Sequence, residues 1–273
     1  MVIAESFKFK EITGFKFGQS LFGKPYLYAH VYFIDGLLID TGHSRMRQQI
    51  TQMLSPLDVQ QIFITHHHED HTGNLHALSK IFACPTRSSK RCAEIMTSPP
   101  SISPAQYITW GSRKAFNQLT PICKTIQTNK YNFEIIPVPG HAEDMVALYE
   151  PTNGWLFSAD LYVNHYIKYF MHSESMLQQI TSIKTLLEYD FDVILCGHNP
   201  QLKNGKEKMQ QKLQFLEDFY GRVQNLYHKG IQDPQRIMLN MNLKEFWMIR
   251  IMSLGSLSTL NMVKSVLSDI KNQ

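Results

Sequence analysis

The sequence lacks the features that mark membrane, secreted and disulfide-rich proteins. No apolar run approaches the roughly 20 residues that a membrane-spanning helix needs. The chain does not start with a basic segment followed by an apolar one, so we predict no secretory signal. The four cysteines form no Cys-x-x-Cys pair and are expected to be reduced thiols. These absences favour a cytoplasmic protein with no membrane partner.

The sequence also lacks a large excess of charge of either sign. Lysine and arginine total 27, and aspartate and glutamate total 23, which gives a net charge of +4. The only basic cluster contains Lys203, Lys206, Lys208 and Lys212, and we interpret it as the solvated face of a helix. Nucleic-acid binding would need a denser basic footprint. We therefore predict a small-molecule substrate and no nucleic-acid partner.

The segment from Thr65 to Gly73, in contrast, is rich in residue types that bind metals. His66, His68 and Asp70 alternate along it, and His71 follows. Alternate residues of an extended segment share a face, so His66 and His68 can point the same way. Asp70 and His71 then continue round a turn and can reach a second ion. Imidazole and carboxylate groups suit zinc and neighbouring divalent metals, so the pattern predicts two metal ions held close together.

Four apolar runs of the sequence each end in a residue of a metal-binding type. The run Gln61–Thr65 precedes His66, and three later runs lead to His141, Asp160 and His198. Strand ends at one edge of a sheet gather distant residues into one pocket. We therefore expect these four residues to complete one site.

The order of these motifs resembles that of the metallo-beta-lactamase-fold hydrolases. It runs from Asp40-Thr41-Gly42, through the His-x-His-x-Asp-His of residues 66–71, to Pro139-Gly140-His141, Asp160 and Gly197-His198. The resemblance implies an α/β fold, an αββα sandwich of two mixed sheets flanked by helices. It also implies a catalytic core over residues 1–202, with an insertion at 84–132 that shapes the pocket. Residues 203–273 would form a C-terminal helical extension packed on the core.

The resemblance further implies a role for each metal-binding residue. His66, His68 and His141 would hold one metal, Asp70, His71 and His198 would hold the other, and Asp160 would bridge the two. Asp40 would support the site through hydrogen bonds to a ligand imidazole, without touching the metal. Two divalent ions about 3.5–4 Å apart can share a water and lower its pKa, so that a bridging hydroxide attacks the substrate. Zinc is the expected metal, and manganese or iron also suit these ligands.

The bridging Asp160 and His198 resemble those of hydroxyacylglutathione hydrolases (glyoxalase II) and of quorum-signal lactonases. A thioester or lactone is therefore the predicted substrate of this hydrolase. Asp70, Asp160 and Tyr162 are the predicted catalytic residues, with the Tyr162 hydroxyl placed to donate a hydrogen bond to the developing oxyanion. The sequence departs from glyoxalase II at Gly73-Asn74, where that family has Gly-Gly.

Other functions remain open from the sequence alone. One is a phosphodiesterase, another is a persulfide dioxygenase with a single iron, and a third is a non-catalytic metal-bound scaffold. His68 argues against the flavodiiron oxygen reductases, which share the fold but carry Glu at that position.

Several segments outside the motifs have a predicted structure but an open role. We expect helices over Thr72–Lys80, Ala105–Leu119 and Glu174–Tyr189. Aromatic residues of the insertion would either line the substrate pocket or pack against the sandwich: Tyr107, Trp110 and Phe116. The C-terminal helices would cap the sandwich, close over the substrate, or pair with a second subunit in a homodimer.

Overall fold

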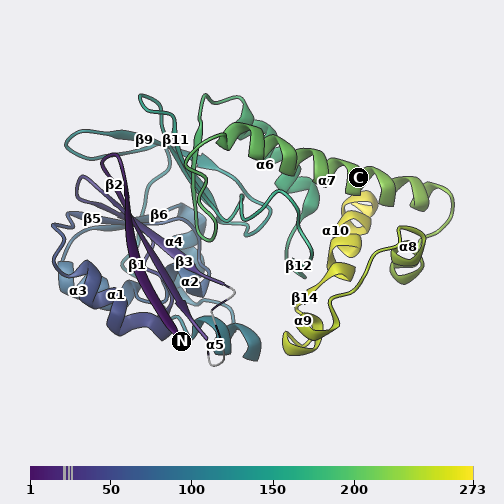
Figure 1. Cartoon of the computed structure of the whole chain (residues 1–273), viewed down its shortest axis with the longest axis horizontal. Coiled ribbons are helices and arrows are strands. Elements are labelled where there is room, and N and C mark those ends of the chain that lie inside the picture. The colour runs from purple at the N-terminus through teal and green to yellow at the C-terminus, as the bar shows by residue number, and fades with distance from the viewer. Residues whose placement is uncertain (21–22, 24, 26, 273) are drawn as a thin grey trace.

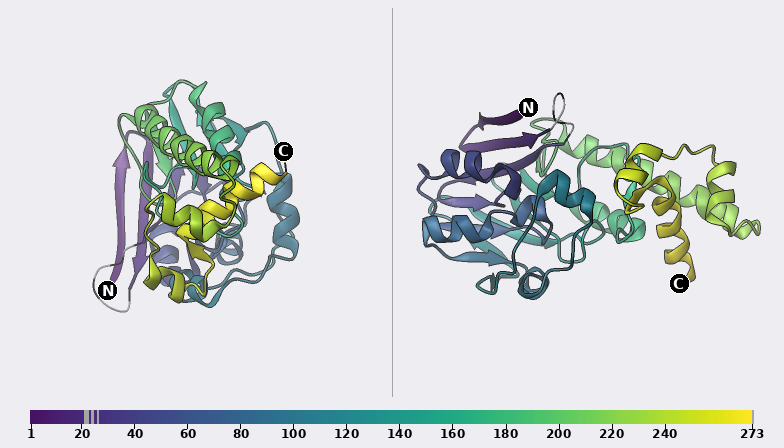
Figure 2. Two further views of the ribbon diagram at one scale, coloured as in Figure 1. Left: turned by 90° about the vertical axis from the view of Figure 1, so that its right-hand side faces the viewer. Right: turned by 90° about the horizontal axis from the view of Figure 1, so that it is seen from below.

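A computed structural model describes residues 1–20, 23, 25 and 27–272, and it shows two β-sheets packed together with helices outside them (Figure 1, Figure 2). The strands are β1 Val2–Phe9, β2 Ile12–Gln19, β3 Ala29–Ile34, β4 Leu37–Ile39, β5 Gln61–Ile64, β6 Thr86–Ser88, β7 Thr120–Pro121, β8 Thr125–Gln127, β9 Asn132–Pro137, β10 Val146–Glu150, β11 Trp155–Ala159, β12 Phe170–Met171, β13 Val193–Cys196 and β14 Leu257–Ser258. The helices are α1 Arg47–Leu54, α2 Glu69–Thr72, α3 Leu75–Phe82, α4 Lys90–Thr97, α5 Pro104–Trp110, α6 Met176–Leu187, α7 Gly205–His228, α8 Pro234–Asn240, α9 Trp247–Met252 and α10 Thr259–Lys271, with a 3₁₀ turn η1 at Ser44–Met46.

The larger sheet has seven strands in the order β1-β2-β3-β4-β5-β6-β7. Strands β1 to β4 pair antiparallel, whereas β4 to β7 pair parallel, so the sheet is mixed. The β3–β4 hairpin turns at Asp35 and Gly36, whose φ angles are +45° and +80°. Two left-handed residues in a row match the twist of a tight hairpin and suit an Asp-Gly pair.

The smaller sheet has the order β13-β11-β10-β9-β8 and is also mixed, because only β11 and β13 are parallel. Its inner face packs on the larger sheet through a shared apolar cluster. Members of that cluster come from both sheets: Ile12, Tyr32, Phe63, Phe133, Leu148 and Phe157. This buried layer holds the two sheets face to face.

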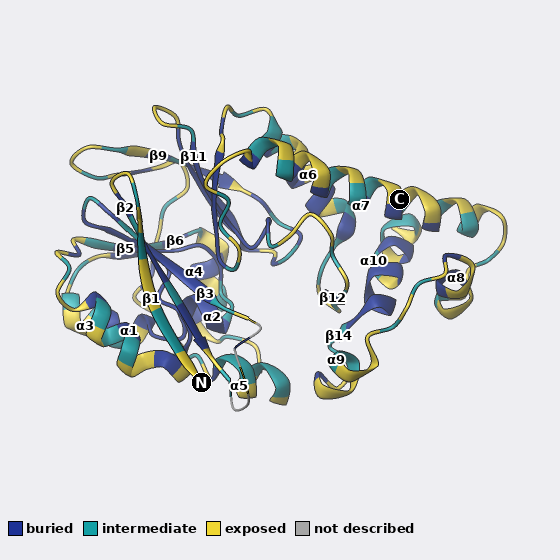
Figure 3. Cartoon of the chain, in the orientation of Figure 1, coloured by how far each residue is buried: buried dark blue, intermediate teal, exposed yellow. Residues whose placement is uncertain are grey.

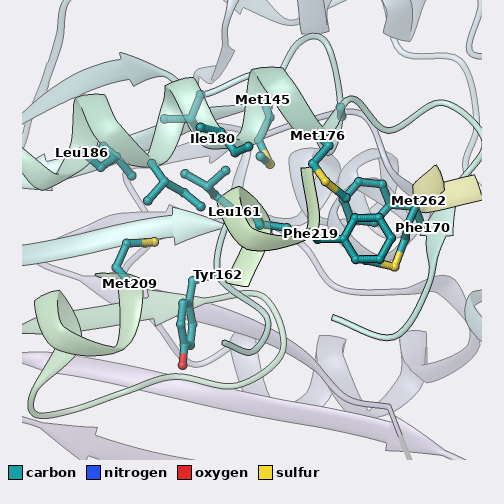
Figure 4. Close-up of a cluster of buried hydrophobic side chains, with 14 of the residues drawn as sticks. Met145, Leu161, Tyr162, Phe170, Met176, Ile180, Leu186, Met209, Phe219 and Met262 are labelled. Carbon is teal, nitrogen blue, oxygen red and sulfur yellow. The ribbon is translucent and has the colours of Figure 1, made fainter. Parts of the chain in front are cut away.

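Helices cover the outer face of each sheet. Residues of α1, α3 and α4 bury their apolar sides with those of the larger sheet, as Ile50, Leu78 and Met96 do. Residues of α6, α7 and α10 join the cluster behind the smaller sheet (Figure 3, Figure 4). The αββα sandwich of two mixed sheets is thereby confirmed.

The predicted helix over Ala105–Leu119 is wrong in its second half. Helix α5 ends at Trp110, because Gly111 takes a φ of +86° that a helix cannot continue. A Cβ on Gly111 would lie 2.2 Å from Ser44 Oγ, so the chain must also lack a side chain there. The helical spacing of apolar residues does not reveal this close approach to Ser44.

The predicted helix over Thr72–Lys80 is confirmed from Leu75 onward as α3, but it does not start at Thr72. Helix α2 ends at Thr72, and α3 begins at Leu75. Between them, Gly73 packs so tightly that a Cβ would lie 2.5 Å from the backbone nitrogen of Ser44. Helix α6 lies within the predicted range 174–189 and confirms that prediction.

The C-terminal region corrects the interpretation of the basic cluster. Lys212 is only 2% exposed, although Lys206 and Lys208 precede it on helix α7 and Lys203 lies just before that helix. Helix α9 differs in the opposite way, because four of its apolar side chains are exposed: Trp247, Met248, Ile251 and Met252 (Figure 3). Among the described residues, no helix combines the length and apolar character that a membrane span requires.

Candidate metal centre

The ends of four strands meet at one edge of the two sheets. His66 follows β5 by two residues, Asp160 follows β11 directly, and His198 follows β13 by two residues. His141 comes from the turn that leaves β9. These side chains, with His68, Asp70 and His71, form two groups whose potential ligand atoms lie within 4.8 Å of one another inside each group.

The first group consists of His66, His68 and His141. His66 Nε2 lies 3.1 Å from His68 Nδ1, and His141 Nε2 lies 3.0 Å from the same atom. Burial, together with the neighbouring imidazoles, holds the pKa of His66 and His68 well below the usual range. Both rings are therefore neutral at pH 7, which is the form that binds a metal.

The second group consists of Asp70, His71, Asp160 and His198. Asp70 Oδ2 lies 3.3 Å from His198 Nε2 and 3.6 Å from His71 Nε2. Asp160 Oδ1 lies 3.4 Å from His71 Nε2. Two carboxylates thus share a buried space with two imidazole nitrogens.

Asp160 lies between the two groups. Its Oδ2 atom is 2.9 Å from His198 Nε2 of the second group and 3.5 Å from His141 Nε2 of the first. Its Oδ1 atom faces His71. A carboxylate in this position can offer an oxygen to a cation in either group.

Two buried atoms of the centre make no hydrogen bond within the described part of the chain. His71 Nε2 and Asp160 Oδ1 have no hydrogen bond to any described residue, although both are inaccessible to solvent. Buried polar atoms are nearly always satisfied, because leaving one unpaired costs about 1–3 kcal/mol. A cation between these atoms would satisfy both, so the donor set fits a divalent metal.

Hydrogen bonds behind the ligands fix which ring nitrogen faces the centre. His71 Nδ1 lies 2.7 Å from Asp40 Oδ2, and His198 Nδ1 lies 2.6 Å from the carbonyl oxygen of Tyr28. His141 Nδ1 lies 3.3 Å from Glu174 Oε2. In each ring the opposite nitrogen is left to bind a metal. Sequence reasoning found Asp40 but missed Tyr28 and Glu174, which no local motif marks.

Replacing Asp40 with asparagine is expected to lower metal affinity about 10- to 100-fold, the usual cost of losing a partner behind a ligand. Asp40 also accepts hydrogen bonds from the Thr65 backbone N–H and hydroxyl group. Its φ angle is +63°, and asparagine tolerates that conformation, so the backbone should stay in place. Competition with a chelator measures the affinity.

The matched control is Asp35→Asn. Asp35 also has a positive φ, +45°, but its carboxylate accepts from the backbone of Lys130, away from the metal groups. Equal losses of metal affinity in the two variants would contradict the role assigned to Asp40.

Metal uptake should be coupled to proton release. Burial alone would lower the pKa of His198, but the carboxylates of Asp160 and Asp70 outweigh it and raise the pKa to about 9 in the metal-free protein. A metal binds only the deprotonated ring, so its apparent affinity should rise with pH up to about 9. The same proton stabilises the metal-free fold below pH 6.5, and that contribution is lost as the pH rises through about 9.

Calorimetric titration with zinc at pH 7, in buffers of different ionisation enthalpy, counts these protons. We expect net release of protons for each protein molecule that is filled with metal. A count of zero would show that the imidazoles are already neutral before the metal binds.

One aromatic residue of the insertion reaches the centre. The ring of Trp110 stacks on that of the ligand His198 at 5.8 Å and 27°, and it also meets the edge of His43 at 5.1 Å. Phe116 packs in the apolar core instead, and Tyr107 is exposed. Of the three aromatic residues, Trp110 alone contacts a metal-binding side chain.

An ion pair ties the same insertion to the metal-binding turn. Arg113 Nη1 lies 2.8 Å from Glu69 Oε2, and both side chains are at most 4% exposed. Glu69 stands between His68 and Asp70 in the chain. The pair therefore anchors the metal-binding turn of residues 66–71, and the sequence does not predict it because the two residues lie 44 positions apart.

Two further residues hold the loops of the centre together. The buried Asp144 accepts from the backbone and ring of His67, each at 2.8 Å. The Asn74 side chain donates to the carbonyl oxygens of Thr41 and His43. Asn74 stands where glyoxalase II has its second glycine, and its side chain joins the loop of residues 41–43 to the metal-binding turn.

Tyr162 packs in the apolar core behind the smaller sheet. It is 1% exposed and belongs to the buried apolar cluster that also contains Leu161 and Met209 (Figure 4). Burial raises the pKa of its hydroxyl group to about 12. This placement does not support the predicted hydrogen bond to an oxyanion.

Comparison with known sequences gives one family. The family model described as Metallo-beta-lactamase superfamily matches residues 26–198. The hydroxyacylglutathione hydrolase of Legionella pneumophila (strain Corby) is 27% identical over 146 residues, which cover 52% of this chain and 49% of the relative. That of Idiomarina loihiensis is 26% identical over 124 residues, 45% of this chain and 40% of the relative. The chain spans about half the length of these curated relatives.

Solved structures share the fold over a greater length. A metallo-beta-lactamase family protein of Thermus thermophilus is 14% identical, with a TM-score of 0.70 over 96% of this chain and 95% of the other. A metallo-beta-lactamase from Pontibacter korlensis is 19% identical, with a TM-score of 0.61 over 79% of this chain and 99% of the other. At these identities the likeness shows the common fold.

Proposed function

The chain belongs to the metallo-beta-lactamase superfamily, and we propose that within it the protein is a hydrolase that depends on two divalent metal ions. The observation that carries this proposal is the position of Asp160. One of its oxygens lies within 3.5 Å of a nitrogen from each of the two ligand groups. A carboxylate that contacts both groups is what a pair of metal ions requires.

The residues divide between two metal positions. His66, His68 and His141 would hold one ion, and Asp70, His71 and His198 would hold the other, with Asp160 between them. Two such ions, when bound, make water acidic enough to supply a hydroxide at neutral pH and polarise the bond under attack.

The protein's own groups prepare the centre for that chemistry. Asp40 holds the His71 ring with Nε2 facing the second group. The Trp110 ring covers one side of His198. Most of the surrounding side chains are buried, which keeps the local dielectric low and strengthens the pull of the ligand charges.

A thioester or lactone is the proposed substrate class. Support comes from the relatives named hydroxyacylglutathione hydrolase, which the chain matches over about half of their length. Zinc is the proposed metal, because imidazole and carboxylate ligands suit it.

A panel of thioesters, lactones and phosphodiesters, assayed with the metal-loaded protein, tests this function. We expect hydrolysis of thioesters or lactones at two zinc or manganese ions per chain. Activity confined to phosphodiesters would overturn the substrate class. A single bound iron with consumption of oxygen would overturn the hydrolase.

We also propose that the C-terminal helices form a homodimer contact through α9. This helix and the residue two positions beyond it expose large apolar side chains, each at least 63% exposed: Trp247, Met248, Ile251, Met252 and Leu254. A contiguous patch of this kind is typical of an interaction surface.

Light scattering after size-exclusion chromatography tests the contact. The double variant Trp247→Ser/Ile251→Ser should be a monomer where the natural chain is a dimer, because it removes two of the largest apolar side chains of the patch. Leu239→Ser, also exposed but on α8, is the control and should remain a dimer. A natural chain that is monomeric at every concentration would rule the contact out.

A further inference from the structure

We propose that Lys212 of helix α7 is a positioning residue for the metal-binding His141 and acts on it through Gln179 and Glu174. The inference rests on the proposed metal centre and assigns to it a side chain from the C-terminal region. Lys212 is 2% exposed, and its ammonium group donates to the carbonyl oxygen of Leu161 and, at 3.2 Å, to Gln179 Oε1. An ammonium group is costly to bury, so a lysine in this place requires a specific set of partners.

The hydrogen bonds from Lys212 continue to the metal centre. Gln179 Nε2 donates to Glu174 Oε2 at 2.8 Å. The same carboxylate oxygen lies 3.3 Å from His141 Nδ1. His141 Nε2 in turn faces His68 Nδ1 at 3.0 Å, inside the first ligand group. Three contacts therefore connect an ammonium group on α7 to a metal-binding ring.

The chemistry of Lys212 gives this chain of contacts a fixed direction. An ammonium group only donates, so the Gln179 amide must present its oxygen to Lys212 and its NH₂ to Glu174. The Glu174 carboxylate only accepts, so His141 must carry its proton on Nδ1. The lone pair of His141 is then on Nε2, the atom that faces the first ligand group.

Backbone contacts couple helix α6, which carries Gln179, to the turn that carries His141. The Ser175 N–H donates to Gly140 O at 2.8 Å, and the Ser182 hydroxyl donates to Pro139 O at 2.7 Å. A Cβ on Gly140 would lie 2.5 Å from the backbone nitrogen of Gln179. Helix α6 thus packs directly on this turn, and a shift of Gln179 reaches His141 without any loop between them.

The environment of Lys212 agrees with this role. Burial lowers its pKa to about 8, while the nearby carboxylates of Glu174 and Asp160 favour the charged form. Helix α7 packs on α6 behind the smaller sheet (Figure 1). The region after residue 202 therefore contributes apolar side chains to the core and also a polar group, the Lys212 ammonium, that is connected to the metal centre by hydrogen bonds.

The test compares Lys212→Met and Gln179→Met with the natural chain. Both variants keep an unbranched side chain and interrupt the hydrogen bonds that lead from Lys212 to Glu174. The control is Lys206→Met on the same helix, whose ammonium donates to Tyr189 O and has no link to a ligand. Stepwise zinc affinity is measured by chelator competition, and the Nδ1–H resonance of His141 is followed by NMR in the zinc-loaded protein.

We expect the affinity of the first ligand group to fall about 10- to 100-fold in both variants, with the second group little changed. The His141 Nδ1–H signal should move and exchange faster with water. The control should match the natural chain in both measurements. If Lys212→Met does not fold, Gln179→Met decides, because it leaves the bond from Lys212 to Leu161 intact.

A folded Gln179→Met protein with unchanged affinity and an unchanged His141 signal would overturn the inference. The proposed function fails in other ways, through a natural chain that binds no pair of metals or hydrolyses no substrate. A natural chain that binds two zinc ions but hydrolyses nothing still allows the comparison of variants.

Discussion

Alanine in place of Asp160 is expected to abolish hydrolysis and to reduce the metal content to one ion or fewer per chain. The Asp160 carboxylate contacts both ligand groups, through Oδ2 to His141 and His198 and through Oδ1 to His71. Losing an outer partner of a ligand costs about 10- to 100-fold in affinity or activity, so losing this carboxylate should cost at least about 100-fold.

The loss of Asp160 also changes the charge of the site. The Asp160 carboxylate raises the pKa of His198, which burial alone would lower. Without it, two imidazoles and the Asp70 carboxylate remain in the second group. Metal analysis of the purified variant and its rate on an activated thioester measure the effect.

Asp218→Ala is the control for this variant. Asp218 accepts a hydrogen bond from Gln214 on the exposed face of helix α7. It carries the same charge as Asp160 without touching either ligand group. A variant at Asp160 that kept two metal ions and full activity, like this control, would remove the basis of the proposed dinuclear centre.

The sequence predicts the fold and the convergence of the ligands because both depend on local patterns. Apolar runs of four to six residues ending in His or Asp mark strand ends, as at Ile64, Ala159 and Cys196. The alternation of His66 and His68 gives their shared direction. The spacing of a motif therefore carries the geometry of the ligands, and the structure brings all seven together.

Residues behind the ligands could not be predicted in the same way. Glu174 stands at the start of a predicted helix, and nothing in that segment points to His141, 33 positions earlier. Lys212 follows Lys206 and Lys208 in a helix with an apolar stripe, so its pattern resembles a solvated face. The angle at which α7 packs on α6 decides that it is buried, and no local pattern contains that angle.

Backbone conformation is a second feature that the sequence does not predict. The sequence from Ala105 to Leu119 suits a helix, yet Gly111 ends it with a positive φ and a close approach to Ser44. A single glycine in a helical pattern only weakens the prediction of a helix. The approach to Ser44 joins the insertion to the loop after β4, and contacts between distant segments are not visible in a local window.

Gly197→Ala is expected to have the second large effect on metal binding and activity, because Gly197 also lies very close to its neighbours. Gly197 lies between β13 and His198, and a Cβ there would be 2.2 Å from Asp160 Oδ1 and 2.8 Å from His71 Cε1. Carbon atoms do not come this near to neighbours without a shift. Either the carboxylate or the imidazole ring must leave its place.

The backbone cannot move away to make room for the methyl group. The Gly197 N–H donates to Ala159 O at 3.1 Å, and Gly197 O accepts from the His30 N–H at 2.7 Å. Both sides of the residue are thus fixed to neighbouring strands. The methyl group should therefore displace Asp160 and His71, the two residues whose facing atoms lack a hydrogen-bond partner among the described residues.

We expect Gly197→Ala to lose the metal of the second group and at least about 100-fold in activity, as for a damaged ligand set. Overpacking should also lower the free energy of unfolding by about 1–3 kcal/mol. Metal analysis, the rate on an activated thioester and thermal unfolding measure the three effects.

Gly221→Ala provides the matched control, because Gly221 lies inside helix α7 and a Cβ there meets no atom within 4 Å. Alanine at that position should stabilise the fold by about 0.5–1 kcal/mol, since glycine loses more backbone freedom in a helix. A lower free energy of unfolding in Gly197→Ala and a higher one in Gly221→Ala would show that the metal centre needs the space beside Asp160. A Gly197→Ala protein with two metal ions and normal activity would mean that no cation lies between Asp160 and His71.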